Sequence, residues 1–225
     1  MQLHREGRVT LAIVIIFFLV ANIGGAFLLP GDSIWLFWIF LVTAVLLVFF
    51  LQFFRNPKRR IVEDDRAVLA PADGKVVVIE RAFDKEYTGR EMVMVSIFMS
   101  PLNAHMNLMP GSGTIEHLHY HDGKYLMAFN PKSSQENERT SIGLKLNNGH
   151  KLLIRQVAGF LARRICYYVK RNDQLKQGDE FGFIKFGSRL DVFMPVGTEI
   201  TVKKGQATTA GQTPIGLLPL KVEED

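Results

Sequence analysis

The chain has 225 residues, 48% of them hydrophobic, and a formal net charge of +5 at pH 7. This size and composition fit either one well-filled domain or a smaller domain that follows membrane segments. The positive charge suits an anionic partner, either a nucleic acid or an anionic lipid surface. The single cysteine, Cys166, excludes an intramolecular disulfide and a cysteine-based metal cluster, and it fits a reducing compartment.

Two long apolar segments open the chain, residues 9–29 and 34–54. Each is long enough for a membrane-spanning helix of roughly 20 residues, and neither contains a charged side chain. A signal peptide followed by a buried helix is the alternative, but a signal peptide has a shorter apolar core and no second span directly after it. We therefore expect residues 1–60 to form a membrane anchor of two helices joined by a tight connection.

Basic residues flank this hairpin on both sides and are absent from its connection: Arg5, Arg8, Arg55, Lys58, Arg59 and Arg60. By the positive-inside rule, both ends of the hairpin and the rest of the chain lie on the cytoplasmic side of the inner membrane. The basic segment after the second helix would meet lipid headgroups. A membrane anchor therefore favours lipid over nucleic acid as the anionic partner.

Residues 61–225 are expected to form one β-rich domain, a barrel or sandwich, which makes the whole chain α+β. Apolar or alternating runs predict strands at 75–80, 92–99, 114–120, 142–146, 151–157, 180–186, 190–194 and 199–203. Asn148-Gly149 is the clearest hairpin signal. Residues 160–170 fit either a short helix or a strand, and 205–216 fit a loop before a last short strand.

Gly187 and Ser188 fall between two of these predicted strands. A glycine there indicates a bend or a close approach of backbones. Because Gly187 has no side chain, its carbonyl carbon is open to attack by the hydroxyl of Ser188, so the serine could act on its own backbone. A bulge or tight turn is the alternative, since Gly-Ser pairs are common in turns.

Five short segments occur in a fixed order along the chain. They are 71–76 (PADGKV), 100–107 (SPLNAHMN), 120–125 (YHDGKY), 137–139 (NER) and 186–188 (FGS). Together they resemble the phosphatidylserine decarboxylase family, most closely its short bacterial and archaeal branch, over residues 53–216. The order and number of the segments carry the resemblance, because none of them is specific alone.

This resemblance implies a self-processing enzyme. In that family the serine hydroxyl attacks the preceding glycine carbonyl, the peptide becomes an ester, and elimination splits the chain. Carried to this sequence, the cut falls between Gly187 and Ser188 and gives a β chain, 1–187, and an α chain, 188–225, which remain associated. Ser188 becomes a pyruvoyl group.

The resemblance also implies the reaction. The amine of phosphatidylserine in the membrane forms a Schiff base with the pyruvoyl group, which accepts the electrons left behind as carbon dioxide departs. Phosphatidylethanolamine is then released, with no pyridoxal phosphate or metal required. The resemblance leaves open whether the enzyme forms a homo-oligomer.

His105 matches the family histidine that positions substrate and transfers protons, and its ordinary pKa suits that role near neutrality. A structural histidine at a strand end is the alternative. Asp73 matches an aspartate that supports self-cleavage through a second histidine in the longer bacterial branch, or it is simply a turn residue. Here Leu108 stands in place of that histidine, and Arg189 follows Ser188 where the longer enzymes have threonine. Either His105 serves both steps or another group activates Ser188.

The lipid phosphate has several candidate ligands, with solvated surface charge as the alternative for each: Lys124, Arg139, Arg163 and Arg164. His117, His119 and His121 alternate and would share one face of a strand. They lack an acidic or cysteine ligand beside them, so we expect a solvated or lipid-facing strand face rather than a metal site.

Two other functions compete with this one. Residues 70–76 also look like the strand entry of lipoyl-type domains, which suggests a membrane-tethered carrier or adaptor. Such a carrier needs a modifiable lysine at a hairpin tip, and the sequence has none in that setting. The third alternative is a decarboxylase of another serine-headgroup lipid or of a soluble amino acid, and the two membrane spans argue against the soluble substrate.

Overall fold

The computed structural model describes residues 2–123, 137–159, 165–185 and 188–220. The chain divides into two compact units, Met1–Lys58 and Arg59–Asp225. Each unit is described by itself below.

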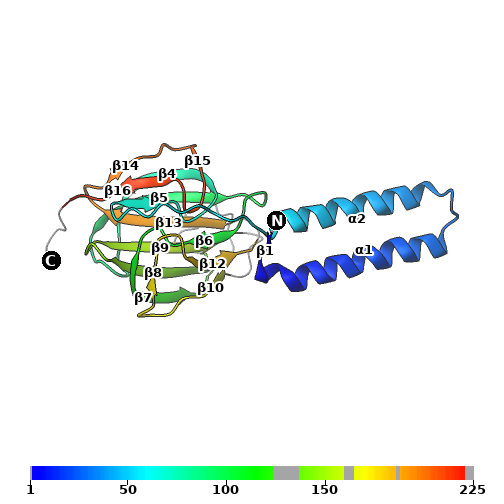
Figure 1. The fold of residues 1–225 in the computed structure, drawn as a ribbon, viewed down its shortest axis with the longest axis horizontal. Coiled ribbons are helices and arrows are strands. Elements are labelled where there is room, and N and C mark those ends of the chain that lie inside the picture. Colours follow the sequence, from blue (N-terminus) through cyan, green and yellow to red (C-terminus); the bar gives the residue numbers. More distant parts are fainter. Residues whose placement is uncertain (1, 124–136, 160–164, 186–187, 221–225) are drawn as a thin grey trace. The chain divides into compact units, whose positions relative to one another are not determined.

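The first unit is a helical hairpin (Figure 1). Helix α1 spans Arg8–Leu28 and helix α2 spans Ile34–Phe53, within a residue of the predicted segments. Both are long and apolar enough to cross a membrane, and most of their large side chains are exposed. A helix that is apolar on all sides and is not covered by protein is typical of a membrane span.

A polar contact joins the two helices inside this apolar hairpin. The side-chain amide of Asn22 donates to Thr43 Oγ1 at 2.9 Å, and Thr43 donates in turn to the Ile39 carbonyl at 2.7 Å. In lipid such groups need partners within the protein, so this pair helps to hold the helices together. The hairpin is extended at its base by the short helix η1, Arg5–Gly7, and by the pairing of β1, Gln2–Leu3, with β2, Arg55–Asn56.

The second unit is built on an antiparallel sheet of eight strands, curled like half of a barrel (Figure 1). In spatial order the strands are β11 (Gln174–Leu175), β7 (Gly113–His121), β8 (Arg139–Leu146), β9 (Lys151–Ala158), β13 (Ser188–Pro195), β5 (Glu91–Met99), β4 (Gly74–Phe83) and β15 (Ala207–Thr208). Strand β13 therefore lies between β9 and β5 in the middle of the sheet.

Two three-stranded sheets complete the unit. One contains β10 (Ile165–Tyr167), β12 (Glu180–Ile184) and β6 (Met106–Leu108), and the other contains β14 (Glu199–Ile200), β16 (Pro214–Leu217) and β3 (Ala67–Leu69). Both small sheets contribute apolar side chains to the main core.

The main core lies on one face of the large sheet. From β13 it takes Leu190, Val192 and Met194, which alternate along the strand. The opposite face carries a smaller apolar cluster that includes Phe193 and Leu153. Strand β13 is thus buried on both faces, and its polar residues Ser188, Arg189 and Asp191 are buried together with its apolar ones.

The mainly β fold and the helical hairpin before it were predicted correctly. The Asn148-Gly149 hairpin is also confirmed, since Gly149 has a φ of 91° and its N–H donates to the Leu146 carbonyl at 2.9 Å. The strand expected at 199–203 is wrong in length: β14 ends at Ile200, because Lys203 and Gln206 form a turn. The ambiguous segment 160–170 contains the short strand β10 in its described part.

Candidate functional site

Ser188 is the first residue of β13 and is held from both sides. It pairs with Met99 at the end of β5 and with Ala158 at the end of β9. Its side chain is fully buried, and its hydroxyl donates to Met99 Sδ at 3.3 Å. A thioether is a weak acceptor, so the hydroxyl is not committed to a strong hydrogen bond. Gly187 lies outside the described residues.

His105 lies directly before β6 and is fully buried. Its main-chain carbonyl accepts from the Ile184 N–H at 3.4 Å, so it lies against the last residue of β12, from which the chain runs to Ser188. The ring Nδ1 lies 2.9 Å from the Asn103 carbonyl. Because a carbonyl only accepts, Nδ1 carries the hydrogen, and Nε2 is the basic nitrogen of the neutral ring.

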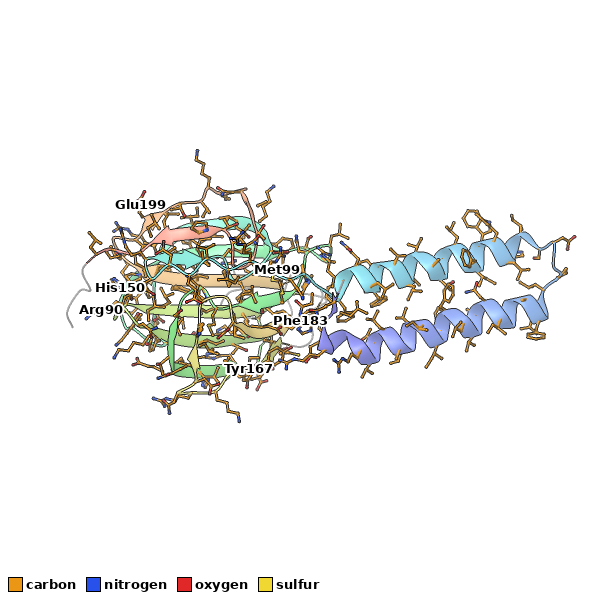
Figure 2. The ribbon with its side chains drawn as sticks, viewed as in Figure 1. Arg90, Met99, His150, Tyr167, Phe183 and Glu199 are labelled. Carbon is orange, nitrogen blue, oxygen red and sulfur yellow. The ribbon has the colours of Figure 1, made fainter. Side chains whose placement is uncertain are left out.

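A buried amide connects the surroundings of the serine and of the histidine. Asn107 Nδ2 lies 3.9 Å from Met99 Sδ and 3.4 Å from the His105 carbonyl, and Asn107 Oδ1 accepts from Gln156 Nε2 at 2.7 Å. Asn107 and Gln156 are both fully buried. Figure 2 shows Met99 and Phe183 at the same end of the β-rich unit, and the Phe183 ring is 6.2 Å from that of His105. Ser188 and His105 therefore belong to one buried region at this end of the sheet.

Asp73 lies at the same end of the sheet, directly before β4. The register aligns Lys75, Phe98 and Arg189 in one row across β4, β5 and β13, so Asp73 is two strands away from Ser188, roughly 10 Å between backbones. Its carboxylate accepts from Arg59 Nη2 at 2.5 Å and from the Ala210 N–H at 2.8 Å. Both oxygens are thus used away from Ser188, and a direct role for Asp73 stays a prediction.

The pairing of Arg59 changes one expectation from the sequence. This residue belongs to the basic segment that was expected to meet lipid headgroups. Its side chain is only 17% exposed and forms the ion pair with Asp73, so it stabilises the turn that enters β4. That turn is tight, because a Cβ on Gly74 would lie 2.3 Å from the Phe98 carbonyl oxygen.

Arg139 lies on the other face of the sheet. Arg139 and Arg189 both pair with Val157, and paired residues project to the same side, which is opposite to that of Ser188. Arg139 Nη2 lies 3.5 Å from Glu86 Oε1. Its contact with a lipid phosphate stays a prediction. Lys124, Arg163 and Arg164 lie outside the described residues.

Glu86 is the centre of a charged cluster on that face. Arg155 Nη2 lies 3.0 Å from Glu86 Oε1, and His121 Nε2 lies 3.2 Å from Oε2. Burial raises the pKa of Glu86, but the Ser141 hydroxyl and the positive charges of Arg155, His121 and Arg139 outweigh it, so the pKa falls below 4.5. The pKa of His121 is lowered from 6.5 by burial and by Arg139, against the attraction of Glu86.

The three alternating histidines share a face as predicted. The rings of His119 and His121 are 4.3 Å apart, and the ring of His117 stacks on Tyr87 at 6.0 Å. Within the described ranges no group of three His, Cys, Asp or Glu side chains is placed to hold a metal ion. The half-buried ring of His121 is held by Glu86, so this face is less open to solvent than the sequence suggested.

Sequence reasoning missed Met99, Asn107 and Gln156 as neighbours of the site. Asn107 carried a signal, because it lies two residues after His105 in the segment 100–107. Gln156 carried no such signal, since the contacts of a glutamine within an apolar strand are known only once the neighbouring strands are known.

Comparisons with known proteins support the same family throughout. A family model described as phosphatidylserine decarboxylase matches residues 46–216. A protein of Cytophaga hutchinsonii, named phosphatidylserine decarboxylase proenzyme, is 44% identical over 96% of this chain and 98% of its own length. Proteins with the same name from Amoebophilus asiaticus and Chlorobium phaeobacteroides are 42% and 48% identical, the first over the whole of both chains and the second over 77% of this chain and 81% of its own.

Proposed function

The chain belongs to the phosphatidylserine decarboxylase family and is a decarboxylase, and from this premise we propose that it forms a pyruvoyl group from its own Ser188 and uses it to convert phosphatidylserine to phosphatidylethanolamine and carbon dioxide. The related proteins are named proenzymes, which fits a chain that must be cut before it acts. The proposal assigns no role to pyridoxal phosphate or to a metal.

The burial of Ser188 is the observation that carries this proposal. Its side chain has no exposed surface and lies at the first residue of a central strand. A serine that served only to close a turn would not need to be buried in a central strand. In a site without bulk water, an ester formed with the preceding carbonyl is protected from simple hydrolysis, which favours the elimination that self-cleavage requires.

The residues around Ser188 have distinct parts in self-cleavage. The Ser188 hydroxyl attacks the carbonyl of Gly187, the peptide nitrogen leaves that carbon to give an ester, and elimination releases the Gly187 carboxylate and leaves a dehydroalanine at position 188. This residue then takes up water and releases its nitrogen as ammonia, which leaves the pyruvoyl group. The weak contact with Met99 Sδ leaves the hydroxyl free to turn toward the carbonyl. His105 is our candidate for removing the hydroxyl proton, with Asp73 supporting the turn into β4 through Arg59 and Ala210.

The buried surroundings of Ser188 suit the group that this reaction would leave. The pyruvoyl carbonyl supplies an electron sink for the loss of carbon dioxide. Asn107, which is bound to Gln156, lies 3.9 Å from the Met99 sulfur that Ser188 contacts, and a small buried polar group in this region needs such hydrogen-bond partners. His105 would return a proton to the substrate carbon from Nε2, because Nδ1 is held by the Asn103 carbonyl.

The strand pairing explains how the two cut chains could stay together. Strand β13, at the start of the proposed α chain, pairs with β5 over Ser188–Pro195 and also with β9. Strands β15 and β16, farther along the same chain, pair with β4 and β3. The strands of the α chain therefore pair with strands of the β chain in the same sheets, and the two chains would not dissociate without unfolding.

The apolar hairpin supports a place at the membrane. A phospholipid keeps its tails in the bilayer, so an anchored enzyme meets its substrate at the bilayer surface. We place the β-rich unit on the cytoplasmic side of the inner membrane because basic residues flank the hairpin.

The first test is the intact mass of the purified protein, together with a carbonyl-reactive probe. We expect two chains, the shorter beginning at residue 188 and reactive with the probe. Ser188→Ala should give one uncut chain without decarboxylase activity, whereas Ser141→Ala, which changes another buried serine, should be cut and active. A cut or active Ser188→Ala protein would remove Ser188 from the mechanism. Assays of phosphatidylserine against free serine and an ether-linked lipid with the same headgroup then define the substrate.

A further inference from the structure

A cavity of about 370 Å³ lies on the face of the large sheet opposite to the side chain of Ser188. It is lined from β4, β5, β9 and β13, and from Lys204 in the turn after β14. Cavities that hold small molecules have volumes of roughly 300–1,000 Å³. The proposed decarboxylation uses none of the residues that line this one.

Arg189 gives the cavity a buried donor. Its Nε donates to Asp191 Oδ1 at 2.6 Å and its Nη2 to Ser96 Oγ at 2.8 Å. The residue is 1% exposed, and within the described part of the chain Nη1 has no hydrogen-bond partner. A buried donor on a charged group is costly when it is left unpaired. Arg189 lines the cavity, and its buried Nη1 is the guanidinium donor that a bound ligand would have to reach.

Arg155 adds a second guanidinium to the same cavity. Its central carbon lies 4.7 Å from the centre of the Phe193 ring, and its Nη2 is bound to Glu86. Its Nε is also buried without a hydrogen-bond partner among the described residues. Two guanidinium groups with free N–H donors form the kind of site that binds phosphate oxygens.

The remaining charges and the walls define what the cavity can accept. Lys204 adds a positive charge, and Glu80 is the acidic residue in the lining, exposed on β4. The carboxylates of Asp191 and Glu86 are already bound to Arg189 and Arg155. The other walls are apolar and include Val78, Ala82, Met94 and Phe193. The cavity thus joins an end lined by two guanidinium groups to an apolar one.

We propose that this cavity binds a phosphate ester, with the phosphate at Arg189 and Arg155 and a short apolar chain against Met94 and Phe193. A free phosphate ion would use the guanidinium groups but would leave the apolar walls uncovered. An uncharged chain would leave the buried donors unpaired. Because Arg189 directly follows Ser188 in β13, a bound ester would also stabilise the beginning of this strand.

Thermal unfolding of the full-length protein in neutral detergent tests this site. Hexyl phosphate is the probe. Inorganic phosphate and hexanol are the comparison ligands, because they carry the phosphate group and the apolar chain separately. We expect hexyl phosphate to raise the unfolding midpoint in a saturable way, and to bind at least about tenfold more tightly than inorganic phosphate, since burial of several methylene groups adds to affinity. The uncut Ser188→Ala chain should bind equally well, so the result does not depend on the proposed decarboxylation.

Two variants and one control locate the binding. Arg155→Gln should weaken hexyl phosphate by about tenfold or more, the loss expected for a charge-assisted hydrogen bond. Ala82→Phe, which fills the cavity and keeps every charge, should abolish binding. Arg171→Gln, on the wall of a different cavity of about 410 Å³, should leave it unchanged. Binding that survives Ala82→Phe, or equal affinity for inorganic phosphate and hexyl phosphate, would overturn the proposal.

Discussion

At the scale of single residues, the environment of His105 fits both a catalytic and a structural histidine. Both its main-chain carbonyl and its Nδ1 are bound to neighbouring segments, which fixes the ring. A fixed ring with Nε2 left for proton exchange is what general acid catalysis requires. The same contacts would also suit a purely structural residue, so a kinetic measurement is needed.

His105→Ala should lower the turnover of phosphatidylserine by about a hundredfold or more in protein that has already been cut, the usual loss for a general acid. The measurement is the rate per carbonyl-reactive site, which corrects for incomplete maturation. His150→Ala is the matched control, because His150 is also buried and lies at the opposite end of the β-rich unit from Met99 (Figure 2). Unchanged turnover in cut His105→Ala protein would return His105 to a structural role.

The sequence indicated which residues to consider but not which groups they touch. Ser188 and His105 were found from short segments far apart in the chain, and the structure brings their surroundings together through Met99 and Asn107. Asp73 was found in the same way, yet its partner Arg59 had been read as a lipid contact. Contacts between side chains depend on three-dimensional packing, which neither motif order nor charge counting reports.

At the scale of elements, local patterns predicted the long strands and missed the short ones. Apolar runs mark β5 and β9 clearly, at 92–95 in the first strand and at 152–154 in the second. Strands of two or three residues, such as β6 and β15, are too short to show a period and exist because a neighbour pairs with them. Strand β6 matters most, since it places His105 against β12.

The cluster around Glu86 joins β7, β8 and β9 to the segment between β4 and β5, and it should make stability depend on pH. His121 has a folded pKa below its ordinary 6.5, so the unfolded chain takes up its proton first as pH falls. The contribution of neutral His121 to the free energy of unfolding is therefore complete above about pH 6.5 and is lost as the pH falls below that value. The lowered pKa of Glu86 acts in the same direction, but in the window below 4.5.

We expect the thermal unfolding midpoint to fall between pH 7 and pH 5, and His121→Gln to reduce this dependence. His150→Gln is the control, because His150 lies between β8 and β9 and contacts the Pro219 carbonyl at 2.9 Å rather than Glu86. The measurement is a series of unfolding curves at constant ionic strength in the same neutral detergent. An equal pH dependence in the His121→Gln and wild-type proteins would show that His121 does not contribute.

At the scale of the whole molecule, composition separated an apolar hairpin from a β-rich remainder, but it could not order the strands. The central strand β13 pairs with β5 across a separation of 89 residues at Ser188 and Met99. Such pairing joins segments that are far apart in the chain and leaves no local signal, so it needed the structure. The proposed cut lies directly before one of the two central strands of the large sheet, and no local pattern indicated this.

The last prediction concerns the orientation of the helical hairpin in the membrane. If both ends of the hairpin are cytoplasmic, the connection between α1 and α2 must face the other side of the inner membrane. In a Cys166→Ser background, which removes the single native thiol, Ser33→Cys should react with a membrane-impermeant thiol reagent in spheroplasts. Lys204→Cys should react only after the membrane is opened. The reverse pattern would place the β-rich unit outside the cytoplasm, and the substrate would then have to be supplied from the outer leaflet of that membrane.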